Sequence, residues 1–237
     1  MSSFGDSVQR MLGEPLSEVQ AAAFERYADE LLEWNQRMNL TAVREREAVF
    51  TRHFLDSLSC WLAMRAQPGE RVIDVGTGAG LPGLPLKIWQ PGLQLTLLES
   101  VAKKASFLEH VVQVLGLQNV QVLTKRAEDA GQLPAQREQY DWAVARAVAP
   151  LRVLAEYLLP FVRVGGYMLA QKARGVAEEA KDAANAFGQL GGKLHELVRV
   201  QVPGLEEEER WLVVVQKVKP TQARFPRQAG TPGKKPL

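Results

Sequence analysis

The 237-residue chain is 46% hydrophobic and 24% charged with a net charge of +2, a composition typical of a globular protein with ample material for a core. One cysteine and three histidines exclude an internal disulfide and argue against a structural zinc site, so Cys60 is expected to be a small buried hydrophobe. No apolar run approaches the roughly 20 residues of a membrane span, and the start of the chain lacks the apolar core of a secretory signal, so we expect a cytoplasmic protein without a membrane partner.

Residues 1–68 are predicted to form a helical extension. Ser17 and Gln20 match a capping box, in which each side chain satisfies the backbone amide of the other residue. Apolar residues then recur at helical spacing over 17–34. This pattern predicts an amphipathic helix whose apolar side chains belong to the core.

A polar break at 35–43 separates this helix from a second one expected over 47–66. Asn39 lies in the break, where its short polar side chain can point into a site or merely cap a turn. In the second helix His53 and Asp56 stand three residues apart and can face the same way. Taken alone, such a pair is more often a structural hydrogen bond than a reactive pair, so both interpretations stay open.

From residue 69 to 218 the pattern changes to alternating strands and helices, the signature of a mostly parallel sheet. Strands are predicted at 71–75, 94–99, 120–124, 141–146, 165–170, 195–202 and 210–218, and helices near 81–90, 101–115, 150–161 and 174–188. Only Pro203 to Glu209 separate the last two strands, too few residues for a crossover helix, so these strands should form an antiparallel hairpin. Five parallel strands followed by such a hairpin describe an α/β, Rossmann-like class I S-adenosylmethionine-dependent methyltransferase fold with seven strands.

The stretch Arg71–Gly83 runs from the first predicted strand into a glycine-dense turn, and a helix follows, which is the opening of a nucleotide-binding domain. The turn satisfies the dinucleotide pattern G-x-G-x-x-G. Asp74 precedes it, however, and a carboxylate there would repel a pyrophosphate but favour the sulfonium and ammonium of S-adenosylmethionine. Glu99, at the end of the next strand, can accept both ribose hydroxyls. The predicted cofactor contacts of this region are Asp74, Gly76, Gly78, Gly80 and Glu99; the alternative is a surface turn with incidental acids.

Ligands of an open parallel sheet lie across the carboxyl ends of its strands, so the residues just after each strand matter most. Glu128 or Asp129, after the third strand, can accept the adenine amino group, or else they are acids at an ordinary helix N-terminus. Arg146 ends the fourth strand after a run expected to be buried, where a cation needs a partner. It either serves the site or forms a structural ion pair with Asp56 or Glu99.

Basic residues mark the surfaces that can touch polyanions. Lys103 and Lys104 fall in the first turn of a predicted helix, where the helix dipole disfavours cations, so they either address an anion or are simply solvated. Residues 219–237 hold five basic residues and no acid, which indicates either a basic C-terminal tail that touches polyanions or a solubilising terminus. The predicted phosphate contacts are Lys103, Lys104, Lys172, Arg224, Arg227, Lys234 and Lys235.

Several stretches together carry a family resemblance: MNLTAV at 38–43, RHFLDSL at 52–58, VIDVGTGAGLPGLPL at 72–86, LLES at 97–100, KRAED at 125–129, VARAVAPL at 144–151 and the ending FPRQAGTPGKKPL. On these motifs the chain closely resembles, over nearly its whole length, the small-subunit ribosomal RNA methyltransferase G family, also called glucose-inhibited division protein B. The resemblance implies an S-adenosylmethionine-dependent enzyme that methylates N-7 of a guanine in the 530 loop of bacterial 16S rRNA. The 30S ribosomal subunit is then its partner, and we expect a monomer.

The same matching implies cofactor contacts at Gly76, Leu81, Ala127, Glu128 and Arg146. The chain departs from the family pattern at Ala79, where proline is frequent, and at Glu99, where aspartate is frequent. Neither change should abolish cofactor binding, although Glu99 is expected to shift the ribose slightly.

The implied reaction needs no general base, because guanine N-7 has an available lone pair at neutral pH. The chain must instead hold the guanine in line with the activated methyl group, and positioning of that kind removes roughly 7–11 kcal/mol of barrier. The predicted catalytic residues are Arg146, which bonds the cofactor or the guanine O-6, and Asn39, His53 and Asp56, which close the pocket. Two other interpretations stay open: a nicotinamide-dependent oxidoreductase, favoured only by the glycine pattern, and a non-catalytic RNA-binding or assembly protein.

Overall fold

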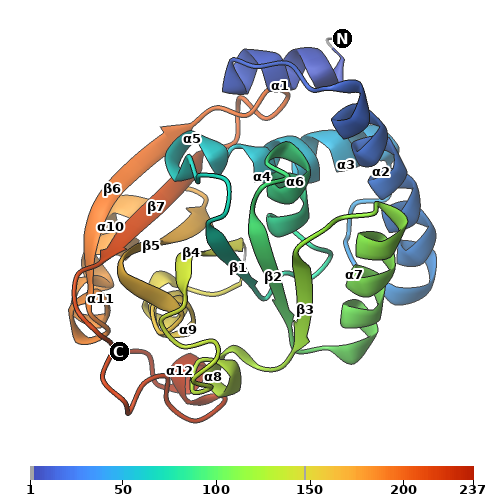
Figure 1. Ribbon diagram of the computed structural model, residues 1–237. Helices are drawn as coiled ribbons and strands as arrows, with labels where there is room; N and C mark the ends of the chain where they lie inside the picture. The colour runs from blue at the N-terminus through green and yellow to red at the C-terminus, as the bar shows by residue number, and fades with distance from the viewer. Residues whose placement is uncertain (1–2, 147) are drawn as a thin grey trace.

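The computed structural model describes residues 3–146 and 148–237, so Ala147 of the motif at 144–151 lies outside the described residues. One sheet runs in the order β3-β2-β1-β4-β5-β7-β6 (Figure 1). Its strands are β1 Arg71–Val75, β2 Gln94–Glu99, β3 Val120–Thr124, β4 Tyr140–Arg146, β5 Val162–Lys172, β6 Gly192–Val200 and β7 Arg210–Lys217. The first five are parallel to their neighbours among themselves, and β7 is antiparallel to both β5 and β6. The predicted seven-stranded, mostly parallel sheet with its terminal hairpin is therefore confirmed.

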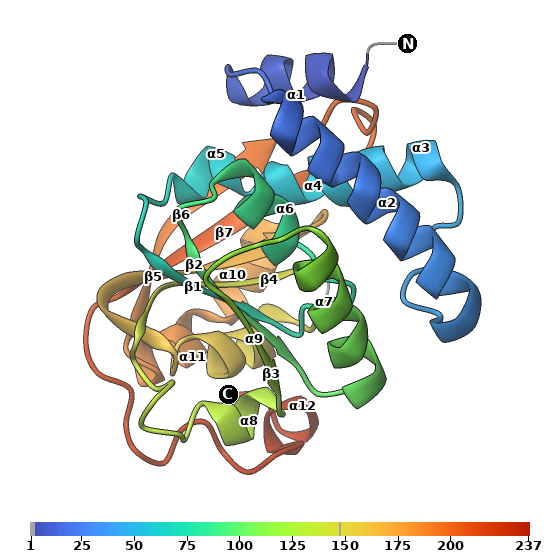
Figure 2. The same cartoon turned by 45° about the vertical axis from the view of Figure 1, so that its right-hand side comes forward.

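Helices cover both faces of this sheet, as Figures 1 and 2 show. One face carries α2 Glu18–Met38, α6 Gly83–Trp89 and α7 Ala102–Val114; the other carries α9 Leu151–Leu158, α10 Val176–Asp182 and α11 Ala184–Gln189. Two short helices, α8 Ala127–Ala130 and α12 Thr231–Lys234, lie beside α9. In the part of the chain that the structure describes, no helix is long and apolar enough to cross a membrane.

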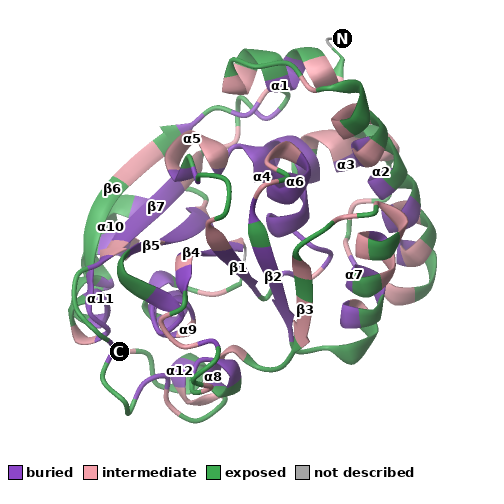
Figure 3. Cartoon of the chain, viewed as in Figure 1, coloured by how far each residue is buried: buried purple, intermediate pink, exposed green. Residues whose placement is uncertain are grey.

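Successive strand residues face opposite sides of the sheet, and each side has its own core. In β1, Val72 packs with the α2, α6 and α7 side, whereas Ile73 and Val75 pack with the α9 side. Both faces are covered, so β1 and β2 are buried beyond their first residues (Figure 3). Cys60 lies in the first of these cores with a free thiol, as the composition predicted.

The N-terminal region contains more helices, and shorter ones, than its pattern predicted. The capping box of Ser17 and Gln20 is present, but α2 continues through the expected break as far as Met38. The single helix expected over 47–66 divides into α3 Arg46–Val49, a π-helical segment η1 Phe50–Leu55, α4 Asp56–Leu58 and α5 Trp61–Met64. An additional helix, α1 Phe4–Leu12, precedes them, with Ser3 and Asp6 forming its own capping box. Such π segments carry extra residues per turn and often mark functional sites.

The C-terminal segment folds back onto the domain instead of extending into solvent. Thr221, Phe225 and Pro232 are buried, and the guanidinium of Arg137 donates to the carbonyls of Thr221, Gln222 and Phe225. The sequence predicted that residues 219–237 are basic, but it did not predict which residues of the domain they contact. This packing brings the segment beside α8 and α9 (Figure 2).

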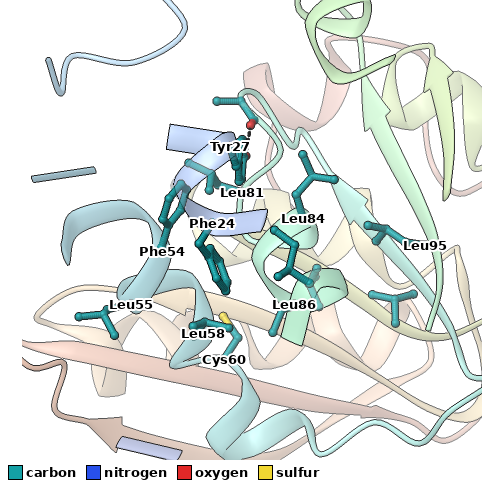
Figure 4. Packing of buried hydrophobic residues seen from close by; sticks show 14 of the residues in the cluster. Phe24, Tyr27, Phe54, Leu55, Leu58, Cys60, Leu81, Leu84, Leu86 and Leu95 are labelled. Carbon is teal, nitrogen blue, oxygen red and sulfur yellow. Dashed lines mark hydrogen bonds between the residues drawn. The ribbon is translucent and has the colours of Figure 1, made fainter. Parts of the chain in front are cut away.

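We predict that Tyr27→Phe destabilises the fold and loosens the glycine turn. The Tyr27 ring stacks on Phe54 and its hydroxyl donates to the carbonyl of Ala79 inside that turn (Figure 4). Removing the hydroxyl leaves a buried carbonyl without its donor, which costs about 1–2 kcal/mol in the free energy of unfolding, measured by urea denaturation. Tyr167→Phe is the control, because that hydroxyl is only partly buried and accepts one long hydrogen bond from Gln216; equal losses in both variants would contradict the prediction.

Candidate active site

The glycine turn after β1 is held by one buried carboxylate. Asp74 has no exposed surface, and its Oδ2 accepts hydrogen bonds from the Thr77 hydroxyl at 2.6 Å and the Gly83 amide at 2.8 Å. A Cβ atom on Gly83 would lie 2.8 Å from that same Oδ2, so the turn needs glycine there. Burial raises the pKa of Asp74 to about 6 against the opposing effect of the Thr77 and Gly83 hydrogen bonds. The other oxygen, Oδ1, is buried and has no hydrogen-bond partner among the described residues.

Glu99 ties the second strand end to the same turn. It is 5% exposed, its Oε2 accepts the amide of Gly78 at 3.0 Å, and its Oε1 accepts the amide of Val101 at 2.8 Å. The sequence predicted that this carboxylate accepts ribose hydroxyls. In the structure its two oxygens also fix the backbone around the turn, a role that sequence spacing could not indicate.

A cavity of about 140 Å³ lies beside the turn, across the ends of β1, β2 and β3. Its lining includes Gly76, Ala127, Glu128, Val148 and Tyr157. The structure thus brings the third strand end next to the glycine turn, as the topology requires. Glu128 is 5% exposed, and its Oε1 accepts the amide of Gly230 from the C-terminal segment at 2.8 Å.

A second cavity, of about 510 Å³, lies at the ends of β4 and β5 and is lined by Arg52, His53, Asp56, Arg146, Gln171, Lys172 and Arg210, among others. The buried carboxylate of Asp56 is its centre. Arg146 donates to its Oδ2 at 2.9 Å, and Arg210 Nε and Gln171 Nε2 donate to its Oδ1 at 2.9 and 3.0 Å. Asp56 is thus the ion-pair partner of Arg146, one of the two acids that the sequence allowed for this role.

His53 is neutral at physiological pH. Burial and, next, the charge of Arg146 lower its pKa to about 4. The Nδ1 atom lies 3.0 Å from the Arg52 carbonyl, which can only accept, so we assign the proton to Nδ1. The Nε2 atom then accepts from the Thr41 hydroxyl at 2.6 Å. Because both ring nitrogens form hydrogen bonds, the His53 ring keeps one orientation in the lining of the cavity.

Asn39 lies apart from these groups. It ends α2 in the left-handed conformation with a φ of 48°, it is exposed, and it does not line the second cavity. The polar contact from this break comes from Thr41 instead, and Asn35 holds the break by accepting the Thr41 amide.

Arg210 is the site residue that sequence reasoning missed. It begins β7, and because β7 is antiparallel to β5, its first residues lie beside the carboxyl end of β5, where Lys172 pairs with Trp211. The predicted hairpin contained this signal. The strand-end rule for parallel sheets does not cover Arg210, because it begins an antiparallel strand.

The residues predicted to touch RNA are divided between open and engaged positions. Lys103, Arg224, Lys234 and Lys235 are exposed, and Lys104 is half-buried. Lys172 pairs with Glu179 at 2.9 Å, and Arg227 forms an ion pair with Glu156, which is fully buried. Whether any of them grips phosphate stays a prediction.

A further cavity of about 590 Å³ lies between α1, η1 and the turn before β7, lined by Phe4, Phe50 and Glu206, among others. Its lining includes no residue of the glycine turn or of the carboxyl ends of the strands, so we do not assign the cofactor to it. Among the described residues no cluster of His, Cys, Asp and Glu could hold a metal ion.

Comparison with known proteins agrees with this geometry. A family model described as rRNA small subunit methyltransferase G matches residues 20–213. The chain is 49% identical over 226 residues to the ribosomal RNA small subunit methyltransferase G of Alkaliphilus metalliredigens, covering 95% of this chain and 94% of the relative. It is 50% identical over 225 residues to the protein of that name from Chloroflexus aggregans, covering 95% and 93%.

Solved structures share the fold at low sequence identity. MtNAS in complex with MTA and tNA has a TM-score of 0.56 at 18% identity, covering 84% of this chain and 71% of that chain. TrmN from Thermus thermophilus has a TM-score of 0.52 at 19% identity, covering 71% and 53%. These identities show the fold alone.

We predict that the stability of the protein depends on pH through His53. Its pKa is lower in the folded than in the unfolded chain, so its contribution is present above pH 6.5 and is lost as the pH falls toward 4. The free energy of unfolding of the parent should fall by up to about 3 kcal/mol relative to His53→Gln between pH 7 and 4, measured by urea denaturation. Asp74 titrates in an overlapping range, but it is common to both proteins and cancels in the difference. Parallel pH curves for the two proteins would contradict the prediction.

Proposed function

The chain belongs to the rRNA small subunit methyltransferase G family, and we propose that it transfers a methyl group from S-adenosylmethionine to N-7 of a guanine in the 530 loop of 16S rRNA. The observation that carries this proposal is the family match over residues 20–213. The seven-stranded sheet and the glycine turn beside a strand-end cavity support it.

The residues around the turn suit S-adenosylmethionine, which when bound supplies an activated methyl group on a sulfonium. Asp74 provides a buried carboxylate with one unpartnered oxygen, and the backbone at Gly76 lines a cavity that a side chain would narrow. We assign the adenine to the cavity at Ala127 and Glu128 and the ribose to Glu99. The proposed cofactor-binding set is Asp74, Gly76, Gly78, Gly80, Leu81, Glu99, Ala127, Glu128 and Arg146.

We assign the target guanine to the second cavity. Arg146 lies on its wall, and the NH2 group of its guanidinium lies 3.4 Å from the protonated Nδ1 of His53, so it donates to no acceptor among the described residues. Those donors suit a carboxylate or the O-6 edge of a guanine. Asp56 acts as a positioning residue, because its two oxygens accept hydrogen bonds from Arg146, Arg210 and Gln171 and so fix where these donors lie. His53, neutral and fixed, closes the cavity.

No residue has to remove a proton in this reaction, because guanine N-7 offers a lone pair at neutral pH. The neutral His53 and the guanidinium of Arg146, which only donates hydrogen bonds, agree with a site that orients its substrate and does no acid–base work. A buried, fixed set of donors serves that purpose well.

The two competing functions lose support. A nicotinamide-dependent oxidoreductase was favoured only by the G-x-G-x-x-G match, whereas the family match over residues 20–213 favours a methyltransferase. A non-catalytic RNA-binding protein would not require Asp74 to be buried at the turn, where its ionised form is disfavoured. For the finer points we propose that the 30S subunit is the partner, that the enzyme is a monomer, and that it works in the bacterial cytoplasm.

The direct test is methyl transfer from radiolabelled S-adenosylmethionine to 30S subunits that lack the modification, followed by mapping of the labelled base. We expect label at N-7 of one guanine of the 530 loop. Label elsewhere in the 16S rRNA would refute the proposed target, and absence of transfer to subunits, precursor particles and naked rRNA alike would refute the activity.

We predict that Arg146→Ala lowers methyl transfer at saturating 30S subunits by roughly ten- to a hundredfold, because a positioned charge-assisted bond of about 1.5–3 kcal/mol is lost. The fold should survive, since Asp56 keeps Arg210 and Gln171 as partners. Single-turnover assays measure the rate, and thermal melting measures stability.

Arg210→Ala is the matched control, because it also removes one arginine from Asp56 but not the donor at the end of β4. If Arg146 serves only to neutralise Asp56, the two variants should lose the same rate at saturation. Equal rates would therefore refute the role of Arg146 in transfer.

We also predict that cofactor affinity depends on pH through Asp74. Its pKa of about 6 means that it is ionised at pH 7 and mostly protonated at pH 5, and only the ionised form attracts a cationic ligand. Binding of S-adenosylmethionine, measured by calorimetry, should weaken by up to about tenfold between pH 7 and 5. Uncharged 5′-methylthioadenosine should show little change, and Asp74→Asn should remove the dependence. The same slope for both ligands would contradict the placement.

A further inference from the structure

The C-terminal segment meets the site at the cavity that we assign to adenine. Figures 1 and 2 both show α12 next to α8, the short helix that carries Glu128. Tyr157 of α9 lines the cavity, and a Cβ atom at Gly233 in α12 would lie 3.8 Å from its hydroxyl. The segment is thus a neighbour of the site.

An internal ion pair anchors this segment. Glu156 in α9 has no exposed surface, and its carboxylate accepts the Arg227 amide at 2.7 Å and the Arg227 guanidinium at 2.6 to 3.1 Å. The same guanidinium donates to the carbonyl of Lys235 at 2.9 Å. A buried carboxylate without a cation beside it is costly, so Arg227 has a structural role in the fold.

One hydrogen bond then connects the segment to the cavity. The Gly230 amide donates to Oε1 of Glu128 at 2.8 Å, with Gly230 in the left-handed conformation at a φ of 82°. Within residues 3–146 and 148–237, no hydrogen bond reaches Oε2 of Glu128, and Glu128 lines the cavity. One carboxylate oxygen is fixed, and the other stays available to an amino group.

We propose that residues 228–237, which we name the strap, position Glu128 for the adenine amino group, so that strap docking and cofactor binding reinforce each other. This inference rests on the proposed placement of the adenine at Glu128. Gly230 is a positioning residue, because it acts through Glu128 and does not touch the cofactor. A side chain fixed in advance loses less freedom when the ligand binds, which raises affinity.

The basic residues of 219–237 divide between internal contacts and exposed positions, so this segment does not serve RNA alone. Arg227 forms an ion pair with Glu156, and the guanidinium of Arg224 lies 4.9 Å from the centre of the Phe225 ring. Lys234 and Lys235 are exposed and can still meet phosphate. The two roles can be told apart by the ligand whose affinity changes. The strap affects the affinity for a neutral nucleoside, whereas contacts with phosphate affect only the affinity for RNA.

The test deletes residues 228–237 from the full chain and measures binding of 5′-methylthioadenosine by calorimetry without RNA. Arg227 stays, so Glu156 keeps its partner and the fold should survive, which thermal melting checks. We expect affinity to fall about five- to tenfold, the loss of one well-placed hydrogen bond. Lys234→Ala with Lys235→Ala is the matched control, since it removes the same two charges but keeps the Gly230 amide, and its affinity for the nucleoside should be unchanged. An unchanged affinity after deletion would overturn the proposal.

A double-mutant cycle with Glu128→Ala separates the strap from a general loosening of the fold. If the strap acts through Glu128, the deletion should have no further effect once Glu128 is removed. Additive losses would overturn the proposed path. The cycle also separates this inference from the function it rests on: if Glu128→Ala alone leaves nucleoside affinity unchanged, the adenine placement fails, whereas a loss in Glu128→Ala but not in the deletion refutes the strap alone.

Discussion

The structure depends on a carboxylate held where water cannot reach it. Asp74 has no exposed surface, and one of its oxygens accepts from both the Thr77 hydroxyl and the Gly83 amide, so this oxygen ties the start of the turn to the first residue of α6. Burial raises its pKa to about 6, which means that ionisation at neutral pH costs free energy that the fold alone does not recover. A cationic ligand at the turn would recover part of it. The turn is therefore less favourable in the free protein than it would be with its cofactor, a common arrangement at binding sites.

The same device recurs around the sheet edge with different partners. Asp56 gathers Arg146, Arg210 and Gln171, and Glu156 gathers Arg227. In each case a buried acid joins elements that are far apart in the chain, α4 with β4, β5 and β7, or α9 with the C-terminal segment. Such pairs add little net stability over apolar residues of the same size, but breaking one is costly. Their effect here is to fix where the donors of the two cavities lie.

Most of the sheet could be predicted from the sequence, because each strand carries a local signal. The predicted bounds of β1, β2 and β3 agree with the structure, and the short connection before Arg210 gave the hairpin. The strand-end rule also found Arg146 and Glu128, since carboxyl ends of parallel strands share one edge. Helix α1 and the division at η1 were missed, because a short helix and a π turn depend on packing against other elements, here the cluster of Phe4, Phe24 and Phe54.

The sequence could not predict which acidic residue pairs with which basic residue. A count of charges along the chain marked residues 219–237 as basic, but Arg227 and Glu156 are 71 residues apart, and no local pattern pairs them. Arg210 was missed for a related reason, since its place at the site follows from strand direction and not from its neighbours in sequence. Net charge thus predicts long-range attraction for RNA only through residues that stay exposed, such as Lys103 and Lys234. The arginines that are partly buried against acids instead determine the geometry of the site, so the basic residues of this chain divide into two groups by exposure, and their position in the sequence does not reveal the division.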